Sequence, residues 1–112
     1  MVFIESRAFT REIHRLASGH ADEVLSSIQS ELLDDPERGD VVPGLSGIRK
    51  ARIASPSTGK GKRGGLRYMF LYLRHRSHVH LLTIYGKGER IDLTREEKKV
   101  LAGLVQQIKQ GQ

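Results

Sequence analysis

Apolar residues recur every three or four positions in three segments of the chain, a spacing that places them on one face of an α-helix. The pattern predicts helices over residues 8–18, 21–33 and 95–109. A capping box at Thr94, with Glu97 three residues on, marks the start of the last helix. The apolar faces of the three predicted helices consist of Phe9, Ile13, Leu16 and Ala17, of Val24, Leu25, Ile28 and Leu32, and of Val100, Leu101, Leu104, Val105 and Ile108.

Segments with the apolar, β-branched and aromatic residues that favour strands lie at residues 1–6, 48–54, 66–74 and 79–87. The last two are apolar on both faces and are joined by a short connection, HRSH. We therefore expect them to form an antiparallel hairpin in the middle of a sheet, covered by helices on at least one side. The turn-rich residues 34–47 are a connection. The predicted class is α+β, with an N-terminal strand and a helical hairpin packed on an antiparallel meander, followed by a C-terminal helix.

Composition excludes several kinds of chemistry and indicates where in the cell the chain is expected. No Cys occurs among the 112 residues, which excludes disulfides, thiolate catalysis and cysteine-based zinc sites. The first residues lack the charged and apolar regions of a signal peptide, and no apolar run approaches the roughly 20 residues of a membrane span. We expect one soluble domain over residues 1–112, in the cytoplasm and without a membrane partner.

Charge is distributed unevenly along the chain. The formal net charge is +6, yet all 13 acidic residues lie outside residues 41–88. That interval is free of acids, and such a one-sided cationic segment favours a polyanionic partner over the alternative of a merely solvated basic surface. Its cations are Arg49, Lys50, Arg52, Lys60, Lys62, Arg63, Arg67, Arg74, Arg76 and Lys87.

The glycine-rich segment STGKGKRGG, residues 57–65, matches the letters of the dinucleotide fingerprint G-x-G-x-x-G. It leads into a strand and not into a helix, so a nucleotide cofactor is not expected. A flexible hairpin loop is one alternative. The other follows from Arg67, which shares a strand face with apolar residues and stands next to the loop cations. Glycine backbone lets a phosphate approach closely, and arginine can bind it through two hydrogen bonds.

Three motifs then appear together: G-I-R-K-x-R-x-A at residues 47–54, G-K-G-K-R-G-G-x-R at residues 59–67, and L-T-I-Y-G-K at residues 82–87. Over roughly residues 35–99 the chain resembles the RelE superfamily of bacterial toxins, most closely its HigB-like branch. The resemblance implies a RelE-like fold and the activity of an mRNA interferase. Such an endoribonuclease of a type II toxin–antitoxin system cuts mRNA in the ribosomal A site and so inhibits translation. It needs no metal or other cofactor.

The resemblance also implies roles for individual residues. Arg67 matches the strand arginine that clamps the scissile phosphate. Lys87 or Lys62 is the expected proton-transfer group, and Lys60 completes the predicted catalytic set. The residues expected to bind RNA or the ribosome are Arg49, Lys50, Arg52, Arg63, Arg74 and Arg76.

The expected partners are the ribosome with its 16S rRNA, the mRNA, and a cognate antitoxin of the helix-turn-helix or ribbon-helix-helix type. Two other functions remain open at this point. A ParE-like chain of the same fold would inhibit DNA gyrase, and a non-catalytic protein would bind RNA or ribosomes without cutting, with an affinity that falls steeply with salt.

Overall fold

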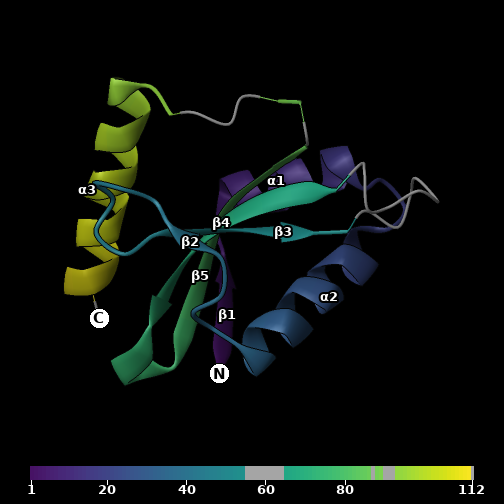
Figure 1. Cartoon of the computed structure of the whole chain (residues 1–112), viewed down its shortest axis with the longest axis horizontal. Coiled ribbons are helices and arrows are strands. Elements are labelled where there is room, and N and C mark those ends of the chain that lie inside the picture. The colour runs from purple at the N-terminus through teal and green to yellow at the C-terminus, as the bar shows by residue number, and fades with distance from the viewer. Residues whose placement is uncertain (55–64, 87, 90–92, 112) are drawn as a thin grey trace.

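The computed structural model of the chain describes residues 1–54, 65–86, 88–89 and 93–111. Figure 1 shows a central sheet with α1 and α2 on one side and α3 set apart from them. The elements in chain order are β1 Val2–Glu5, α1 Arg7–Leu16, α2 Ala21–Asp34, β2 Asp40–Val41, β3 Arg49–Ile53, β4 Leu66–Leu73, the short 3₁₀ turn η2 Arg74–Arg76, β5 His78–Gly86 and α3 Arg95–Gln110. None of the helices within the described residues has the length and apolar character needed to cross a lipid bilayer.

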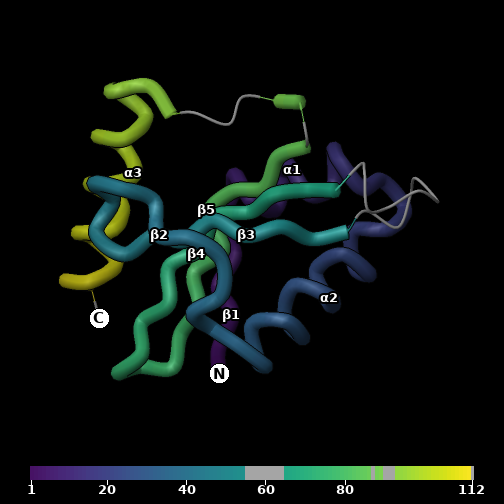
Figure 2. Tube along the Cα trace, viewed as in Figure 1, coloured from purple at the N-terminus to yellow at the C-terminus, as the bar shows by residue number. Residues whose placement is uncertain are grey.

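The strands follow the order β1-β5-β4-β3-β2 across the sheet, so the β4–β5 hairpin is central, as its apolar character predicts. All neighbouring strands are antiparallel except β1 and β5, which run parallel. Figure 2 shows β1, which pairs with β5, at the N-terminal end of the chain, whereas α3 lies at the C-terminal end. The predicted α+β class and element order are confirmed, with β2 added inside the predicted connection.

The two faces of the sheet carry different apolar clusters. One cluster packs under α1 and α2, and the other packs under α3 and the loop at residues 42–48. Successive residues of β4 alternate between them, because side chains of a strand point to opposite faces. Leu66, Tyr68 and Phe70 belong to the first cluster, whereas Met69, Leu71 and Leu73 belong to the second.

Ser6 fixes the start of α1 on the sheet. Its hydroxyl accepts a hydrogen bond from the Phe9 amide at 3.0 Å and donates one to the Leu82 carbonyl at 2.7 Å. One side chain thus satisfies an unpaired amide at the helix N-terminus and ties the helix to β5. The helix then buries Phe9 and Ile13 against the sheet, as the spacing of its apolar residues predicts.

α3 is held at both of its ends. The predicted capping box is present, with Thr94 and Glu97 exchanging side-chain-to-backbone hydrogen bonds. At the other end, the Arg76 guanidinium donates to the Ile108 and Lys109 carbonyls, each at 3.0 Å. The prediction that Val100 lies on the apolar face was wrong, since 71% of this residue is exposed. Only Val105 of this helix is fully buried.

Candidate functional site

Arg67 lies in the middle of a row of three residues that crosses the sheet. In β3 its register partner is Arg52, and in β5 it is Tyr85. Neighbouring strands are about 4.8 Å apart, so the row spans about 10 Å. Neighbours of each member in sequence belong to the cluster under α1 and α2, which places the row on the α3 face of the sheet. These neighbours are Ala51 and Ile53, Leu66 and Tyr68, and Ile84. We call it the Arg52–Arg67–Tyr85 row.

The row lies beyond the N-terminal end of α3. The C-terminal turn of this helix contacts Arg76 at the hairpin tip. Its first turn reaches a pocket beside Met69 and Thr83, a register pair that lies two residues along the strand from Arg67. Arg52 is exposed and Arg67 is half-buried. A ligand on the α3 face can therefore reach both guanidinium groups.

Two arginines directly opposite each other make an unfavourable pair, because like charges at facing positions of neighbouring strands repel. Within the described residues, neither side chain forms an ion pair or a hydrogen bond. The next row, by contrast, pairs Lys50 with an acid, since Asp40 of β2 is its register partner. The arrangement at Arg52 and Arg67 concentrates positive charge without neutralising it, which suits an anionic ligand such as phosphate.

A β-bulge decides which residue of β5 joins this row. From the hairpin tip to Phe70 the two strands pair residue for residue, but the register shifts between Met69 and Phe70. Phe70 pairs with Leu81 and Met69 pairs with Thr83, so Leu82 is the extra residue. Without the bulge, Ile84 would stand opposite Arg67. With it, the phenol ring of Tyr85 does, and this ring also packs on the α3-side cluster.

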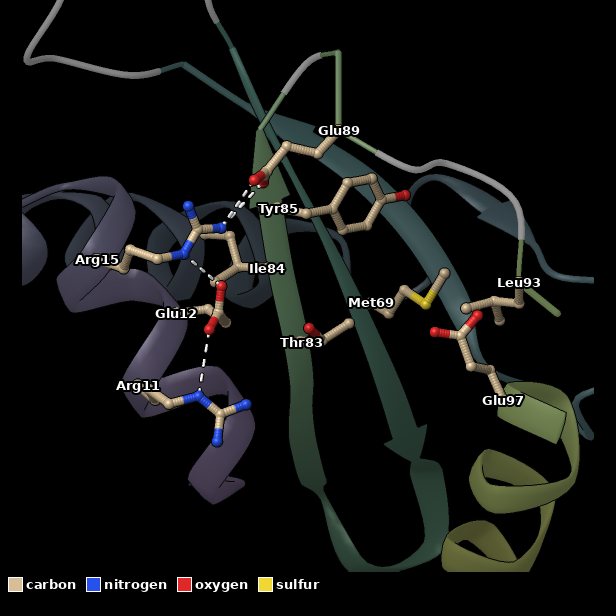
Figure 3. Close-up of a pocket in the computed structure, with 10 residues that line it drawn as sticks. All are labelled: Arg11, Glu12, Arg15, Met69, Thr83, Ile84, Tyr85, Glu89, Leu93 and Glu97. Atoms are coloured by element: carbon tan, nitrogen blue, oxygen red, sulfur yellow. Dashed lines mark hydrogen bonds and ion pairs between the residues drawn. The ribbon is translucent and has the colours of Figure 1, made fainter.

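A pocket of about 350 Å³ opens beside the row, between α1 and the first turn of α3. Figure 3 shows Met69, Thr83 and Tyr85 on the two central strands, with charged residues of α1 on one side and Glu97 of α3 on the other. Tyr85 belongs to both the row and the pocket, so the two features are continuous.

An ion-pair network forms the α1 side of this pocket. Arg15 donates to Glu12 at 2.7 Å and to both oxygens of Glu89 at 2.9 and 3.1 Å, and Arg11 adds a bond to Glu12 at 3.2 Å. The Gly86 amide donates to Glu89 Oε1 at 2.6 Å. Hydrogen bonds from Arg15 and Arg11 lower the pKa of Glu12, and the Gly86 amide followed by Arg15 lowers that of Glu89. Both carboxylates are therefore ionised at neutral pH.

The other predicted RNA-binding cations are dispersed, and two of them have structural partners. Arg49 points to the opposite face from Arg52, and its Nη1 donates to the Glu37 and Gly39 carbonyls at 2.6 and 3.3 Å. Arg76 holds the end of α3. Arg74 lies in the turn at the far end of β4, seven residues and about 23 Å from Arg67. Of the described cations, Lys50 and Arg52 share a face with Arg67.

Four predicted site residues lie outside the described residues: Lys60, Lys62, Arg63 and Lys87. Their roles stay predictions from the sequence. Sequence reasoning did not assign a role to Tyr85, Thr83, Arg15 or Glu89. Tyr85 and Thr83 both lie inside the L-T-I-Y-G-K motif, which was the signal for them. Arg15 and Glu89 are brought to the site by the packing of α1 on β5 and by the hydrogen bonds between them.

No model of a protein family matches the chain. Among solved structures, it is similar to an arginine double mutant of the E. coli toxin RelE in the free state, with 17% identity over 93% of this chain and 95% of that one, at a TM-score of 0.58. The isolated E. coli RelE toxin matches with 14% identity over 96% and 97% of the two chains, at a TM-score of 0.56. A chain of the intact E. coli RelBE toxin–antitoxin complex matches with 18% identity over 80% and 98%, at a TM-score of 0.50.

These likenesses extend over most of the chain and confirm the RelE-like fold predicted from the motifs. At identities below one residue in five, they establish the fold and leave the activity to be argued from the site.

Proposed function

We propose that the chain is the toxin of a type II toxin–antitoxin pair and acts as a ribosome-dependent mRNA endoribonuclease of the HigB-like kind. The observation that carries the proposal is the Arg52–Arg67 pair, two facing arginines on the accessible part of a RelE fold that have no acidic partner in the described part of the chain. A fold stabilised by its own contacts gains nothing from such a pair, whereas a site for RNA phosphate does.

The proposed reaction is an internal transfer at phosphorus that needs no metal. The ribose 2′-oxygen attacks the adjacent phosphate, an O2′–P bond forms and the P–O5′ bond breaks. A base takes the proton from the 2′-OH, and an acid returns one to the departing 5′-oxygen. The products are a 2′,3′-cyclic phosphate and a free 5′-hydroxyl.

Arg67 is the proposed stabiliser of the charge that develops on the phosphorane, because it stands between Arg52 and Tyr85 on the reacting side of the sheet. Arg52 and Lys50 would hold the RNA backbone from the neighbouring strand. The sequence nominates Lys87 or Lys62 as the proton-transfer group, with Lys60 nearby in the same basic segment as Lys62.

A cognate antitoxin is the proposed protein partner. The similarity to a chain of the E. coli RelBE toxin–antitoxin complex supports this assignment. An acidic segment of the antitoxin would neutralise Arg52 and Arg67 and so occupy the position of the RNA backbone. Ribosome and mRNA are the proposed nucleic-acid partners of the same face.

The test is to express the protein from a tightly controlled promoter and to map mRNA 5′ ends on translated and untranslated copies of one transcript. Cuts confined to the translated copy are expected, together with growth arrest. Arg67→Ala serves as the inactive control. Arrest without cuts but with DNA breaks would replace the proposal by gyrase inhibition, and RNA binding without arrest or cuts would replace it by a non-catalytic role.

A further inference from the structure

The pocket beside the Arg52–Arg67–Tyr85 row differs from the row in its charge. The row consists of two cations and a tyrosine, whereas the charged residues that line the pocket are two cations and three carboxylates: Arg11, Arg15, Glu12, Glu89 and Glu97. A second phosphate would meet those carboxylates at close range and be repelled. A neutral group with hydrogen-bond donors fits this wall better, and RNA offers such groups on its base edges.

The distance between the two features corresponds to one nucleotide. Met69 follows Arg67 by two residues on the same strand face, about 6.6 Å away, and Tyr85 is about 4.8 Å away on the next strand. A phosphate held by Arg67 thus places an attached ribose over the row and its base over Met69, Thr83 and Tyr85. The cavity of about 350 Å³ lies at the low end of small-ligand pockets, which span about 300–1,000 Å³.

The pocket wall is preorganised and retains acceptor capacity. A carboxylate has about four acceptor positions. Within the described residues, the Glu12 carboxylate accepts hydrogen bonds from two arginines, one on each oxygen, which leaves acceptor positions on both oxygens. On Glu89, Oε1 accepts from the Gly86 amide and from Arg15, while Oε2 accepts from Arg15 alone. Arg15 bridges the two carboxylates, and this bridge restricts their orientation before a ligand arrives.

The floor of the pocket adds a flat ring and a hydroxyl. The ring of Tyr85 projects along the floor in Figure 3, between Glu89 and Met69. Aromatic side chains are the surfaces on which proteins stack unpaired RNA bases. Thr83 is a half-buried residue on the same floor. Its hydroxyl forms no hydrogen bond with the rest of the described chain, so it can donate to or accept from a base edge.

We propose that this pocket is a base-recognition subsite for the nucleotide next to the scissile phosphate, and that it prefers bases with an exocyclic amino group over uracil. The assignment rests on the proposed ribonuclease function and names the feature of the RNA that the site reads. Adenine, cytosine and guanine each present an amino group to the acceptors of Glu12 and Glu89, whereas uracil presents two carbonyl oxygens and a single ring N–H. Facing carbonyl oxygens and carboxylates repel.

The two methionines of the chain provide a direct test. Met69 lies on the pocket floor, and Met1 lies at the start of the edge strand β1. Protein labelled with ¹³C at the methionine methyls is titrated with the dinucleotides ApA, CpC and UpU, each with a 2′-deoxy first ribose so that it cannot be cut. We expect ApA and CpC to shift the Met69 signal and not the Met1 signal, with about tenfold tighter binding than UpU. Inorganic phosphate serves as the probe for the row alone.

Two variants make the test specific. Glu89→Gln keeps an oxygen for the Gly86 amide but removes the charge, and Thr83→Val removes the hydroxyl at nearly constant shape. Both should reduce the tenfold preference while binding inorganic phosphate as the wild type does. Glu23→Gln, which breaks an exposed ion pair with His20 on α2, is the matched control and should bind all probes unchanged.

Equal binding of UpU and ApA, a Met69 signal that no dinucleotide shifts, or a full preference in Glu89→Gln would each overturn the base subsite. Cleavage mapping on the same protein separates this failure from a failure of the proposed function. A protein that cuts mRNA but shows no base preference at Met69 retains the ribonuclease and loses the subsite. A protein that never cuts mRNA but shifts Met69 with ApA retains the base pocket and loses the ribonuclease.

Discussion

The two faces of the central sheet are built from alternate residues of the same strands, yet they differ in what they leave accessible. On the face toward α1 and α2, the β4 residues Leu66, Tyr68 and Phe70 are all buried in one apolar cluster. On the other face, α3 covers the half that carries Leu71 and Leu73, and the half with Arg67 remains within reach of solvent. The face toward α1 and α2 therefore contributes to stability. The α3 face contributes to stability where α3 covers it and carries accessible positive charge in its uncovered half.

This difference predicts whether a substitution changes stability or activity. A substitution on the α1/α2 face changes the free energy of unfolding and affects activity only through loss of folded protein. A substitution of Arg52 or Arg67 in the Arg52–Arg67–Tyr85 row changes the chemistry and leaves stability nearly constant. The predictions below test that separation, from the largest expected effect to the smallest.

Phe70→Ala should cause the largest loss of stability. Phe70 is completely buried under α1 and α2, and truncation of a core phenylalanine costs about 3–5 kcal/mol because it removes apolar contacts and leaves a cavity. Urea denaturation followed by circular dichroism measures this loss. Folded Phe70→Ala protein at low temperature should still cut translated mRNA. A stability within about 1 kcal/mol of wild type would contradict the assignment of this face as the core.

Arg67→Ala should lower activity and leave stability nearly unchanged, which is the opposite of the result expected for Phe70→Ala. We expect mRNA cleavage to fall by about 10²- to 10³-fold, as when a group that stabilises transition-state charge is removed. The free energy of unfolding should change by no more than about 0.5 kcal/mol, since the half-buried Arg67 has no ion-pair partner within the described residues and loses only its repulsion from Arg52.

Arg7→Ala provides the matched control for that variant. Arg7 is an exposed arginine at the start of α1, which packs on the other face of the sheet. This variant should cut at the wild-type rate. Undiminished growth arrest by Arg67→Ala would remove Arg67 from the mechanism and with it the functional reading of the α3 face.

The sequence alone predicts most of the fold, because most of the fold follows from periodicity. The helix and strand bounds agree with the pattern to within about two residues at each end, and the central position of the hairpin follows from its apolar faces. β2 was missed because two residues carry no periodic signal. The burial of Val100 was predicted wrongly because helical spacing identifies a face and does not show how widely a neighbour covers it.

The site was less predictable, for a physical reason that Tyr85 illustrates. Residue counting from the hairpin tip places Ile84 opposite Arg67, and only the bulge at Leu82 brings Tyr85 there. A register shift of one residue moves each side chain of a strand to the opposite face of the sheet. The local pattern of residues does not predict a bulge. In the same way, the sequence of β3 does not reveal that Arg49 donates a hydrogen bond to the Glu37 carbonyl, whereas Arg52 remains exposed.

Arg76→Gln should have an intermediate effect, confined to the covered half of the α3 face. The variant weakens two charged hydrogen bonds to the last carbonyls of α3, which we expect to cost about 1 kcal/mol. Amide hydrogen exchange should accelerate in α3 and stay constant in α1. If Arg76 instead binds RNA, cleavage will fall without faster exchange in α3, and its structural role in holding that helix will be secondary.

The smallest effect concerns His80, at the boundary between the covered face and β1. Burial lowers the pKa of His80, and the nearby charges of His78 and Arg76 lower it further; Glu5 lines the same small cavity. The folded chain therefore binds this proton less readily than the unfolded chain, in which a histidine titrates near 6.5. Stability should be retained above that pH and should decrease as the pH falls from 6.5 toward the lowered pKa of the folded state.

His80→Gln should remove this part of the acid sensitivity. Urea midpoints measured between about pH 8 and 5 would then fall less steeply for the variant than for the wild type, with the two curves closest at the alkaline end. His75→Gln, at an exposed position in the hairpin turn, is the control and should keep the wild-type slope. An unchanged slope in His80→Gln would mean that α3 and β1 leave this imidazole hydrated, and the covered half of the face would then be more open than its apolar contacts indicate.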